Sequence, residues 1–364
     1  MPDLTRRSLL RASLAGAATS LAGCSLLPPR ASQHQQHYAG ALMLADGSYA
    51  VSAIDRKGQP LWQSPVNERC HSGCWRPGAS ELVFFERRPG WSFYVFDGAT
   101  GKQLQHIAAG KGEHFVGHGV FDLEGRLLYA PASRYEQGEG IVAVYDSNSG
   151  YQRVSTLELG GIGPHQLTIH PDGRTLIVGL GGILTHPDYD RLKLNLDTME
   201  SSLMLMDRFS GEVMARFRPS LQKLSCRHVD VSPSGHIYAA YQYQGPRHER
   251  PPLVAHYRDG RFEEIDFGQE VLEQLGNYIA SVVAHPENGQ VAIASPVGGT
   301  ALIFDGESGT VLNTLRLTDC SGVEALSGGD FLVSSGQGKL VRMSAEGGSA
   351  EIARMPLHWD HHLV

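Results

Sequence analysis

The sequence lacks the features that mark several large classes of protein. After residue 23 it contains no run of roughly 18 consecutive apolar residues, so no further membrane-spanning helix is predicted. The 31 lysines and arginines are outnumbered by 38 aspartates and glutamates and form no basic block, which argues against nucleic-acid binding. A GxSxG motif is missing, and no GxGxxG or Walker A loop occurs in a strand–helix context. Serine-hydrolase chemistry and phosphate-binding loops of these types therefore find no support.

Cysteine is scarce, with five in 364 residues: Cys24 near the N-terminus and, farther along the chain, Cys70, Cys74, Cys226 and Cys320. An oxidising compartment permits disulfides, and four thiols allow three complete pairings. Their spacing does not resemble the paired CxxC knuckles of a zinc ribbon. A local Cys70–Cys74 bridge and buried free thiols both remain open.

The first 23 residues, "MPDLTRRSLLRASLAGAATSLAG", predict an export signal. They begin with a charged segment containing Arg6 and Arg7, continue with a short apolar run and end in small residues, as twin-arginine signals do. The following "LAGC" resembles a lipobox and predicts lipidation of Cys24; the alternatives are an uncleaved anchor or an ordinary signal-peptidase site. Residues 24–36 are expected to form a tether, and the protein to be periplasmic, anchored to a bacterial membrane by lipid only.

Residues 37–364 repeat one pattern of four short strands every 40–60 residues. In four units an aspartate and a glycine-bearing turn precede the last strand, as in "YVFDGATG" (94–101) and "LIFDGESG" (302–309). Alternating apolar residues mark the half-buried strands, and the Asp–Gly segments mark hairpins. Units of this size and composition predict an all-β propeller. Two long insertions, at 181–202 and 241–257, are expected to form loops on the scaffold.

The number of units predicts seven blades. Starts occur near residues 71, 118, 165, 228, 278 and 320, while residues 37–66 supply three strands without an obvious first one. The final "WDHHLV" (359–364) supplies a strand start, so we expect the C-terminal strand to complete the N-terminal blade. An open repeat array would need polar capping units, and none is evident.

Histidine recurs where the innermost strand of each blade is expected to begin. Five of the seven equivalent positions are histidine and a sixth is cysteine: His71, His118, His165, His228, Ser281, Cys320 and His362. Imidazole is the commonest protein ligand for zinc, copper, iron and nickel, and a ring of inner strands would direct several such groups at one axial point. This predicts a transition-metal site, with iron or copper favoured and zinc possible. The alternative is a set of structural histidines in a wet channel.

The favoured ligands are His118, His165, His228 and His362, with His71, Cys320, His114 and His361 as further candidates. Two weaker groups lie elsewhere. Tyr135–Glu136 either places a carboxylate near the channel or stabilises a turn. The "THPDYD" segment contains His186, Asp188 and Asp190, which resemble a set of metal ligands; the alternative is a solvated loop. Ser281 has no evident activating partner.

Several stretches together resemble a known bacterial family. They are "FFERRPG" (84–90), "HFVGHGVF" (114–121), "GIGPHQLTIHPDG" (161–173), "GGILTHPD…RLKLNLDTM" (181–199), "YQYQG" (241–245), "NYIASV" (277–282), "SPVGG" (295–299) and "WDHHL" (359–363). In combination the sequence is similar to the DUF1513 family. That resemblance implies an exported, propeller-like protein whose relatives occur beside imelysin-like and di-haem oxidoreductase-like proteins in apparent iron-acquisition gene clusters. It therefore implies such proteins as partners and a role in periplasmic iron or other metal handling.

Three functions remain open from the sequence. The favoured one is a non-catalytic metal-binding lipoprotein that serves metal uptake or delivery. The second is a metal-dependent oxidoreductase that uses the same histidines, which would require an open coordination position and a nearby redox or acid–base group. The third is a protein-interaction propeller with structural histidines and an exposed apolar patch on one face.

Overall fold

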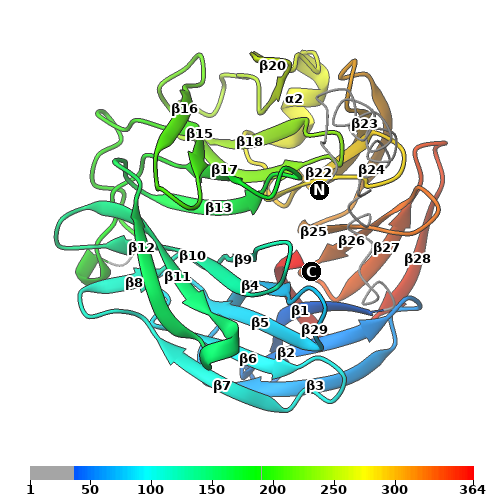
Figure 1. Cartoon of the computed structure of the whole chain (residues 1–364). Coiled ribbons are helices and arrows are strands. Elements are labelled where there is room, and N and C mark those ends of the chain that lie inside the picture. Colours follow the sequence, from blue (N-terminus) through cyan, green and yellow to red (C-terminus); the bar gives the residue numbers. More distant parts are fainter. Residues whose placement is uncertain (1–36, 190) are drawn as a thin grey trace, which may run out of the picture.

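The computed structural model describes residues 37–189 and 191–364, which form seven antiparallel β-sheets arranged as a ring (Figure 1). The predicted all-β, seven-bladed propeller is thereby confirmed. The predicted leader and tether, Cys24 and Asp190 lie outside the described residues. No helix within the described ranges is long and apolar enough to cross a membrane.

The strands of each blade are given from the axis outward. Blade 1 contains β29 (Leu357–Leu363), β1 (His37–Leu44), β2 (Tyr49–Asp55) and β3 (Pro60–Val66), and blade 2 contains β4 (Cys70–Trp75), β5 (Glu81–Glu86), β6 (Ser92–Asp97) and β7 (Gln103–Ala108). Blade 3 has a split inner strand, β8 (Glu113–Phe115) and β9 (Val120–Phe121), followed by β10 (Leu127–Arg134), β11 (Glu139–Asp146) and β12 (Gln152–Glu158). Blade 4 contains β13 (Pro164–Ile169), β14 (Thr175–Leu180), β15 (Ser202–Asp207) and β16 (Val213–Phe217).

The remaining blades follow the same plan. Blade 5 contains β17 (Leu224–Val231), β18 (Ile237–Tyr243), β19 (Val254–Arg258) and β20 (Arg261–Glu264), and blade 6 contains β21 (Ser281–Ala284), β22 (Gln290–Ser295), β23 (Thr300–Asp305) and β24 (Val311–Arg316). Blade 7 contains β25 (Cys320–Ala325), β26 (Phe331–Ser335), β27 (Lys339–Met343) and β28 (Ser349–Arg354). Helix α2 (Gln269–Leu275) precedes β21, and short 3-10 turns occupy Ser147–Ser149 and Pro187–Tyr189.

The repeated aspartate forms the outer hairpin of four blades. In blade 2 the Asp97 carboxylate accepts hydrogen bonds from the backbone N–H groups of Ala99 and Thr100, and Gly101 takes a φ of 73° that favours glycine. The same turn, with its glycine four residues after the aspartate, recurs at Asp146–Gly150, Asp207–Gly211 and Asp305–Gly309. This periodic signal therefore marks one structural position in each of these blades.

The ring closes between the ends of the described chain. Strand β29 pairs antiparallel with β1, with Leu42 opposite Trp359 and Gly40 opposite Leu363, as the sequence predicts. A Cβ atom at Gly40 would lie 2.9 Å from the indole of Trp359, so the small residue permits this close approach. Blade 1 is thus completed by a strand from the opposite end of the chain.

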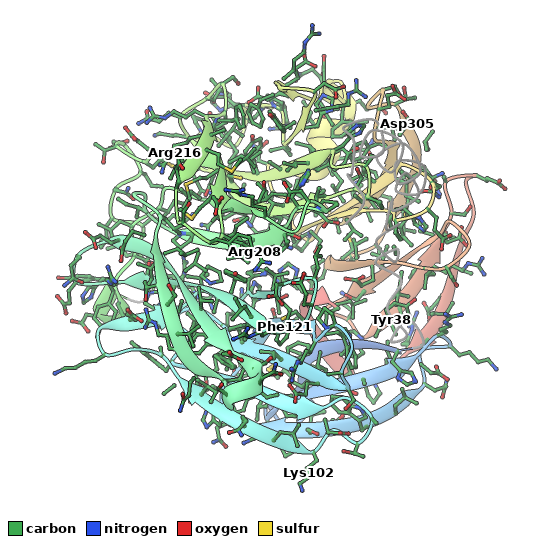
Figure 2. All side chains as sticks on the ribbon, viewed as in Figure 1. Tyr38, Lys102, Phe121, Arg208, Arg216 and Asp305 are labelled. Atoms are coloured by element: carbon green, nitrogen blue, oxygen red, sulfur yellow. The ribbon has the colours of Figure 1, made fainter. Side chains whose placement is uncertain are left out.

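Apolar side chains fill the spaces between adjacent blades, with a few buried polar links. Arg208, labelled in Figure 2, donates to the Tyr129 hydroxyl at 2.9 Å and to the Gly173 carbonyl at 2.6 Å, joining blade 4 to blade 3. Arg216 donates to the carbonyl of Leu159 at 2.8 Å.

The four described cysteines are free thiols, with Cys70, Cys226 and Cys320 buried and Cys74 half-buried. The Cys70–Cys74 bridge is not formed, so the alternative of buried free thiols describes the structure. Burial raises the pKa of the Cys226 thiol to about 12, which keeps it protonated and unreactive.

Candidate metal centre

The inner strands lose their pairing register where they pass the centre of the ring. In β4 the register shifts between Cys70 and Ser72, so His71 is an extra residue in the strand. A β-bulge of this kind redirects a side chain away from the regular pleat. Equivalent shifts contain His165 and Gln166 in β13, Arg227 in β17, Ser321 and Gly322 in β25, and Asp360, His361 and His362 in β29.

Blade 3 reaches the same place by a break in its inner strand. Residues 116–119 separate β8 from β9, and His118 lies in this gap. Gly117 has a φ of 98°, and a Cβ atom there would lie 2.7 Å from Cδ2 of His71. Only glycine combines this backbone angle with so close an approach. The "GHG" sequence therefore brings His118 against its neighbours.

Five imidazoles converge at the centre, and we call His71, His118, His165, His228 and His362 the histidine cluster. Ring centroids are 4.7 Å apart for the pairs His71–His362, His118–His165 and His118–His362, 4.9 Å for His165–His228 and 5.0 Å for His228–His362. All are buried except the half-buried His165. Side-chain nitrogens of His71, His118 and His362 lie within 4.8 Å of one another, as do those of His118, His165 and His228.

Hydrogen bonds to Nδ1 orient three of these rings. Asp360 Oδ1 accepts from His71 Nδ1 at 2.8 Å, and Gln166 Oε1 accepts from His228 Nδ1 at 3.0 Å. The Ser281 hydroxyl lies 3.3 Å from His362 Nδ1. A partner at Nδ1 fixes the tautomer and leaves Nε2 with its lone pair available, which is the usual second shell of a metal-binding histidine.

Three imidazole nitrogens of the cluster are buried without a hydrogen-bond partner among the described residues. They are His118 Nε2, His165 Nδ1 and His362 Nε2. Buried polar atoms are nearly always hydrogen-bonded, because an unmade bond costs about 1–3 kcal/mol. His118 and His362 belong to one group of possible metal ligands and His118 and His165 to the other, so the unpartnered nitrogens lie within candidate donor sets for a metal ion.

The cluster consists of neutral imidazoles. Burial lowers the pKa of His71 to about 3, and the hydrogen bond from Asp360 opposes this shift only in part. Burial also holds the pKa values of His118, His165, His228 and His362 well below 6.5, and the charges of neighbouring histidines add to the effect. Neutral imidazole is the form that binds a metal, so no proton has to be displaced at neutral pH.

Asp360 links the cluster to two arginines. Its Oδ2 accepts from Arg69 Nε at 2.5 Å and lies 3.5 Å from the Arg87 guanidinium. Burial would raise the Asp360 pKa, but the hydrogen bond from His71 and the charge of Arg87 hold it well below its ordinary value. His71, Asp360 and His361 form a further group of possible ligands, with the His361 ring 5.8 Å from that of His71.

Two further candidates lie outside these groups. Cys320 is paired in register with Ser335, as Cys70 is with Glu86, so Cys320 corresponds to Cys70 and not to His71. Its thiol donates to the Ser295 carbonyl at 3.5 Å, and burial raises its pKa to about 12.

His114 lies in β8, where its Nδ1 is 3.0 Å from the carbonyl of Phe115 and its ring stacks on Tyr135 at 6.1 Å. It is buried, but it belongs to none of the groups of possible ligands.

The two weaker candidates from the sequence, Tyr135–Glu136 and the segment with His186 and Asp188, lie close to each other and belong to no group with the cluster histidines. His186 Nε2 lies 3.6 Å from Glu136 Oε1, and its Nδ1 lies 3.7 Å from Asp188 Oδ2. Both carboxylates are exposed, and the Tyr135 ring lies 5.3 Å from the His186 ring. These residues form a surface group with the partly solvated character of a loop.

Sequence reasoning missed the polar residues that surround the imidazoles. Asp360 stands in "WDHH" and Arg227 in "RHVDV", each next to a predicted ligand, but neither was assigned a role. Gln166, directly after His165, was missed as well. A polar residue adjoining a histidine at an irregular point of an inner strand is the signal that could have found all three.

The described residues also line two surface hollows away from the cluster. One, of about 520 Å³, lies beside α2, and the other, of about 320 Å³, lies at the β19–β20 hairpin. None of the cluster histidines lines either hollow. The candidate centre is thus defined by converging side chains within the ring.

Comparison with solved structures supports the fold. The structure titled "Kuenenia stuttgartiensis Hydrazine Synthase" matches with a TM-score of 0.61 and 15% sequence identity, over 86% of this chain and 94% of that chain. At this identity the likeness shows the shared fold alone. In total, 1136 solved chains show a significant structural match.

No curated protein shows a significant sequence match to the chain. Residues 64–364 match the family model described as "Protein of unknown function (DUF1513)". The matched segment includes every member of the histidine cluster, together with Asp360 and Gln166. The chain therefore belongs to the DUF1513 family.

Proposed function

We propose that this protein binds a transition metal ion through the histidine cluster and serves metal acquisition or handling on the periplasmic side of a bacterial membrane. The observation that carries the proposal is the set of three buried, unpartnered nitrogens on His118, His165 and His362. Asp360 and Gln166 accept hydrogen bonds from two further imidazoles, His71 and His228, and would hold these rings in orientation for a metal ion.

The donor set indicates the kind of metal. Neutral imidazoles without a thiolate suit iron, copper, zinc and nickel, whereas calcium and magnesium prefer carboxylate and carbonyl oxygens. Iron or copper is our first choice and zinc the second. Asp360 would orient His71 and add negative charge close to the ion.

A binding role is favoured over catalysis. The carboxylate closest to the cluster, Asp360, is buried and already bonded to His71 and Arg69, so it is not free to exchange protons with a substrate. The second candidate, a metal-dependent oxidoreductase, would use the same imidazoles. Redox titration of the loaded protein separates the two, because a carrier needs no reversible couple in the physiological range.

Elemental analysis of untagged protein purified from the periplasmic fraction tests metal binding. We expect close to one transition-metal ion per chain, and its loss in the His118→Ala/His165→Ala double variant. The matched control is His186→Ala/His248→Ala, which removes two histidines outside the cluster. A protein that contains no metal, and that binds added iron, copper or zinc no more tightly than denatured chain does, would refute the proposal.

Export and anchoring form a separate part of the proposal, supported by the leader sequence. Replacement of Arg6 and Arg7 by lysine is expected to retain the protein in the cytoplasm, and Cys24→Ala to release it from the membrane fraction. Cell fractionation followed by immunoblotting measures both. Imelysin-like and di-haem oxidoreductase-like proteins are the partners we would test first by crosslinking in the periplasm.

A further inference from the structure

Arg227 is a buried charge without a partner among the described residues. It is the bulged residue of β17, only 6% exposed, and its Nε makes no hydrogen bond within the described part of the chain. No carboxylate of the described residues forms an ion pair with it. Buried arginines are almost always paired, because removing a guanidinium from water costs several kcal/mol. Residues 37–189 and 191–364 thus leave this costly buried charge unsatisfied.

The charged groups around Arg227 are also basic. Burial lowers the pKa of Arg88 to about 9, and the positive charges of Arg227, Arg191 and Arg87 contribute. Partial loss of solvent and the charges of Arg227 and Arg88 lower the pKa of Lys193. Like charges gather here although they repel one another, which points to a negative partner that the described residues do not supply.

Topology places these residues at one end of the ring. Residue 88 follows β5, whose last residue Glu86 pairs with Cys70 at the beginning of β4. Residues 191 and 193 lie in the connection after β14, whose last residue Leu180 pairs with Pro164 at the beginning of β13. Both connections therefore lie at the end where the inner strands begin, and Arg227 immediately precedes His228 of the cluster.

The carboxylate of Asp360 is paired with other arginines. Asp360 is bonded to Arg69 and faces Arg87, whereas Arg88 has no hydrogen bond or ion pair among the described residues. A hydroxyl is available from Tyr278, whose electrostatic interactions include Arg88 and Arg227. At Gly181 a Cβ atom would lie 3.3 Å from Arg227 Nε, so the glycine permits the close approach of its backbone to the guanidinium.

We propose that Arg88 and Arg227 form the centre of a binding site for a small oxyanion, a carboxylate or phosphate, at the entrance to the histidine cluster. Guanidinium groups bind both anions through paired N–H donors, and these bonds are strong where water is excluded. Arg191 and Lys193, which are exposed, supply additional positive charge at the rim.

The anion site deepens the proposed function, and this step rests on it. A metal cation held by neutral imidazoles next to Arg227 leaves a concentrated positive charge, because the arginine already acts electrostatically on His118, His165 and His228. An oxyanion between them would neutralise part of that charge. Metal and anion should therefore strengthen each other's binding, and by thermodynamic linkage the factor is the same in both directions.

Isothermal titration of the metal-free protein with inorganic phosphate and with citrate tests the anion site by itself. We expect at least one of them to bind, and Arg227→Met and Arg88→Met each to weaken it about 10- to 100-fold, as expected for lost charge-assisted hydrogen bonds. Comparing the two anions distinguishes a phosphate site from a carboxylate site. The matched control is Lys102→Met, which removes one exposed charge from the outer edge of blade 2 (Figure 2).

Three results would overturn the anion site. They are no binding of either anion at millimolar concentration, binding unchanged in both arginine variants, and an equal loss in Lys102→Met. If Arg227→Met does not fold, Arg88→Met and the charge-preserving Arg227→Lys provide the same comparison. The two proposals fail separately. A protein that binds the anion but never binds metal would refute only the proposed function. Arg88→Met that retains its metal but loses the anion would show that the two sites are distinct.

Discussion

Acid should destabilise the metal-free protein through the histidine cluster. The folded-state pKa values of its five members lie below 6.5. As the pH falls below 6.5, the unfolded chain therefore binds protons that the folded chain does not bind. Their full contribution is present above pH 6.5 and is lost progressively as the pH falls, toward about 3 for His71. Between pH 6.5 and about pH 5.5 each histidine costs about 1 kcal/mol, or about 5 kcal/mol for the five.

Urea unfolding of metal-free protein at intervals across this pH range measures the loss. The His118→Gln/His165→Gln variant should lose about 2 kcal/mol less than the wild type over the same interval, because two proton-binding groups of the unfolded chain are gone. The exposed His248→Gln serves as the control and should follow the wild type. A double variant with the wild-type pH dependence would refute the assignment of neutral, buried imidazoles.

Further predictions concern the residues that hold the site and the blades. Gly117→Ala places a side chain at a φ of 98° against His71 and should cost about 1–3 kcal/mol in a thermal melt; an unchanged melting temperature would contradict the close approach. Asp360→Asn should weaken metal binding about 10- to 100-fold in a competitive metal titration. An affinity equal to that of the wild type would show that Asp360 does not support metal binding by orienting His71. Arg208→Leu should cost about 2–4 kcal/mol in urea unfolding, since it leaves the Tyr129 hydroxyl without its partner between blades; a loss below about 0.5 kcal/mol would show that the link is dispensable.

The fold could be predicted from the sequence because four of the seven blades repeat one local chemical signal. The aspartate four residues before a glycine, as at Asp97 and Gly101, defines the outer hairpin through hydrogen bonds within a few residues. Such short-range interactions are written directly in the sequence. Closure by "WDHHLV" could also be predicted, because a propeller tolerates no missing strand in its ring.

The candidate site could be predicted only in part. Histidines at inner-strand starts indicated the cluster, but which of them converge depends on β-bulges that one sequence does not reveal. Cys320 illustrates the limit: it directly precedes the bulge at Ser321 and Gly322, and a shift of one residue turns a side chain to the opposite face of a strand.

The arginines near the entrance were beyond reach for a different reason. Arg88 and Arg227 are far apart in sequence and come from different blades, and "FFERRPG" was recognised only as part of a family resemblance. Their shared property, the lack of an ion pair among the described residues, is a feature of three-dimensional surroundings. It can be recognised only when the neighbours of each charge are known.

Closure of the ring by β29 also determines when, during synthesis and folding, the candidate ligands come together. Asp360, His361 and His362 are synthesised after every other ligand candidate, and they reach the centre only when β29 docks on β1. A chain still waiting for that strand has neither a closed ring nor a complete set of ligands. Metal loading would then serve as quality control, because it distinguishes finished molecules from those that have not completed folding.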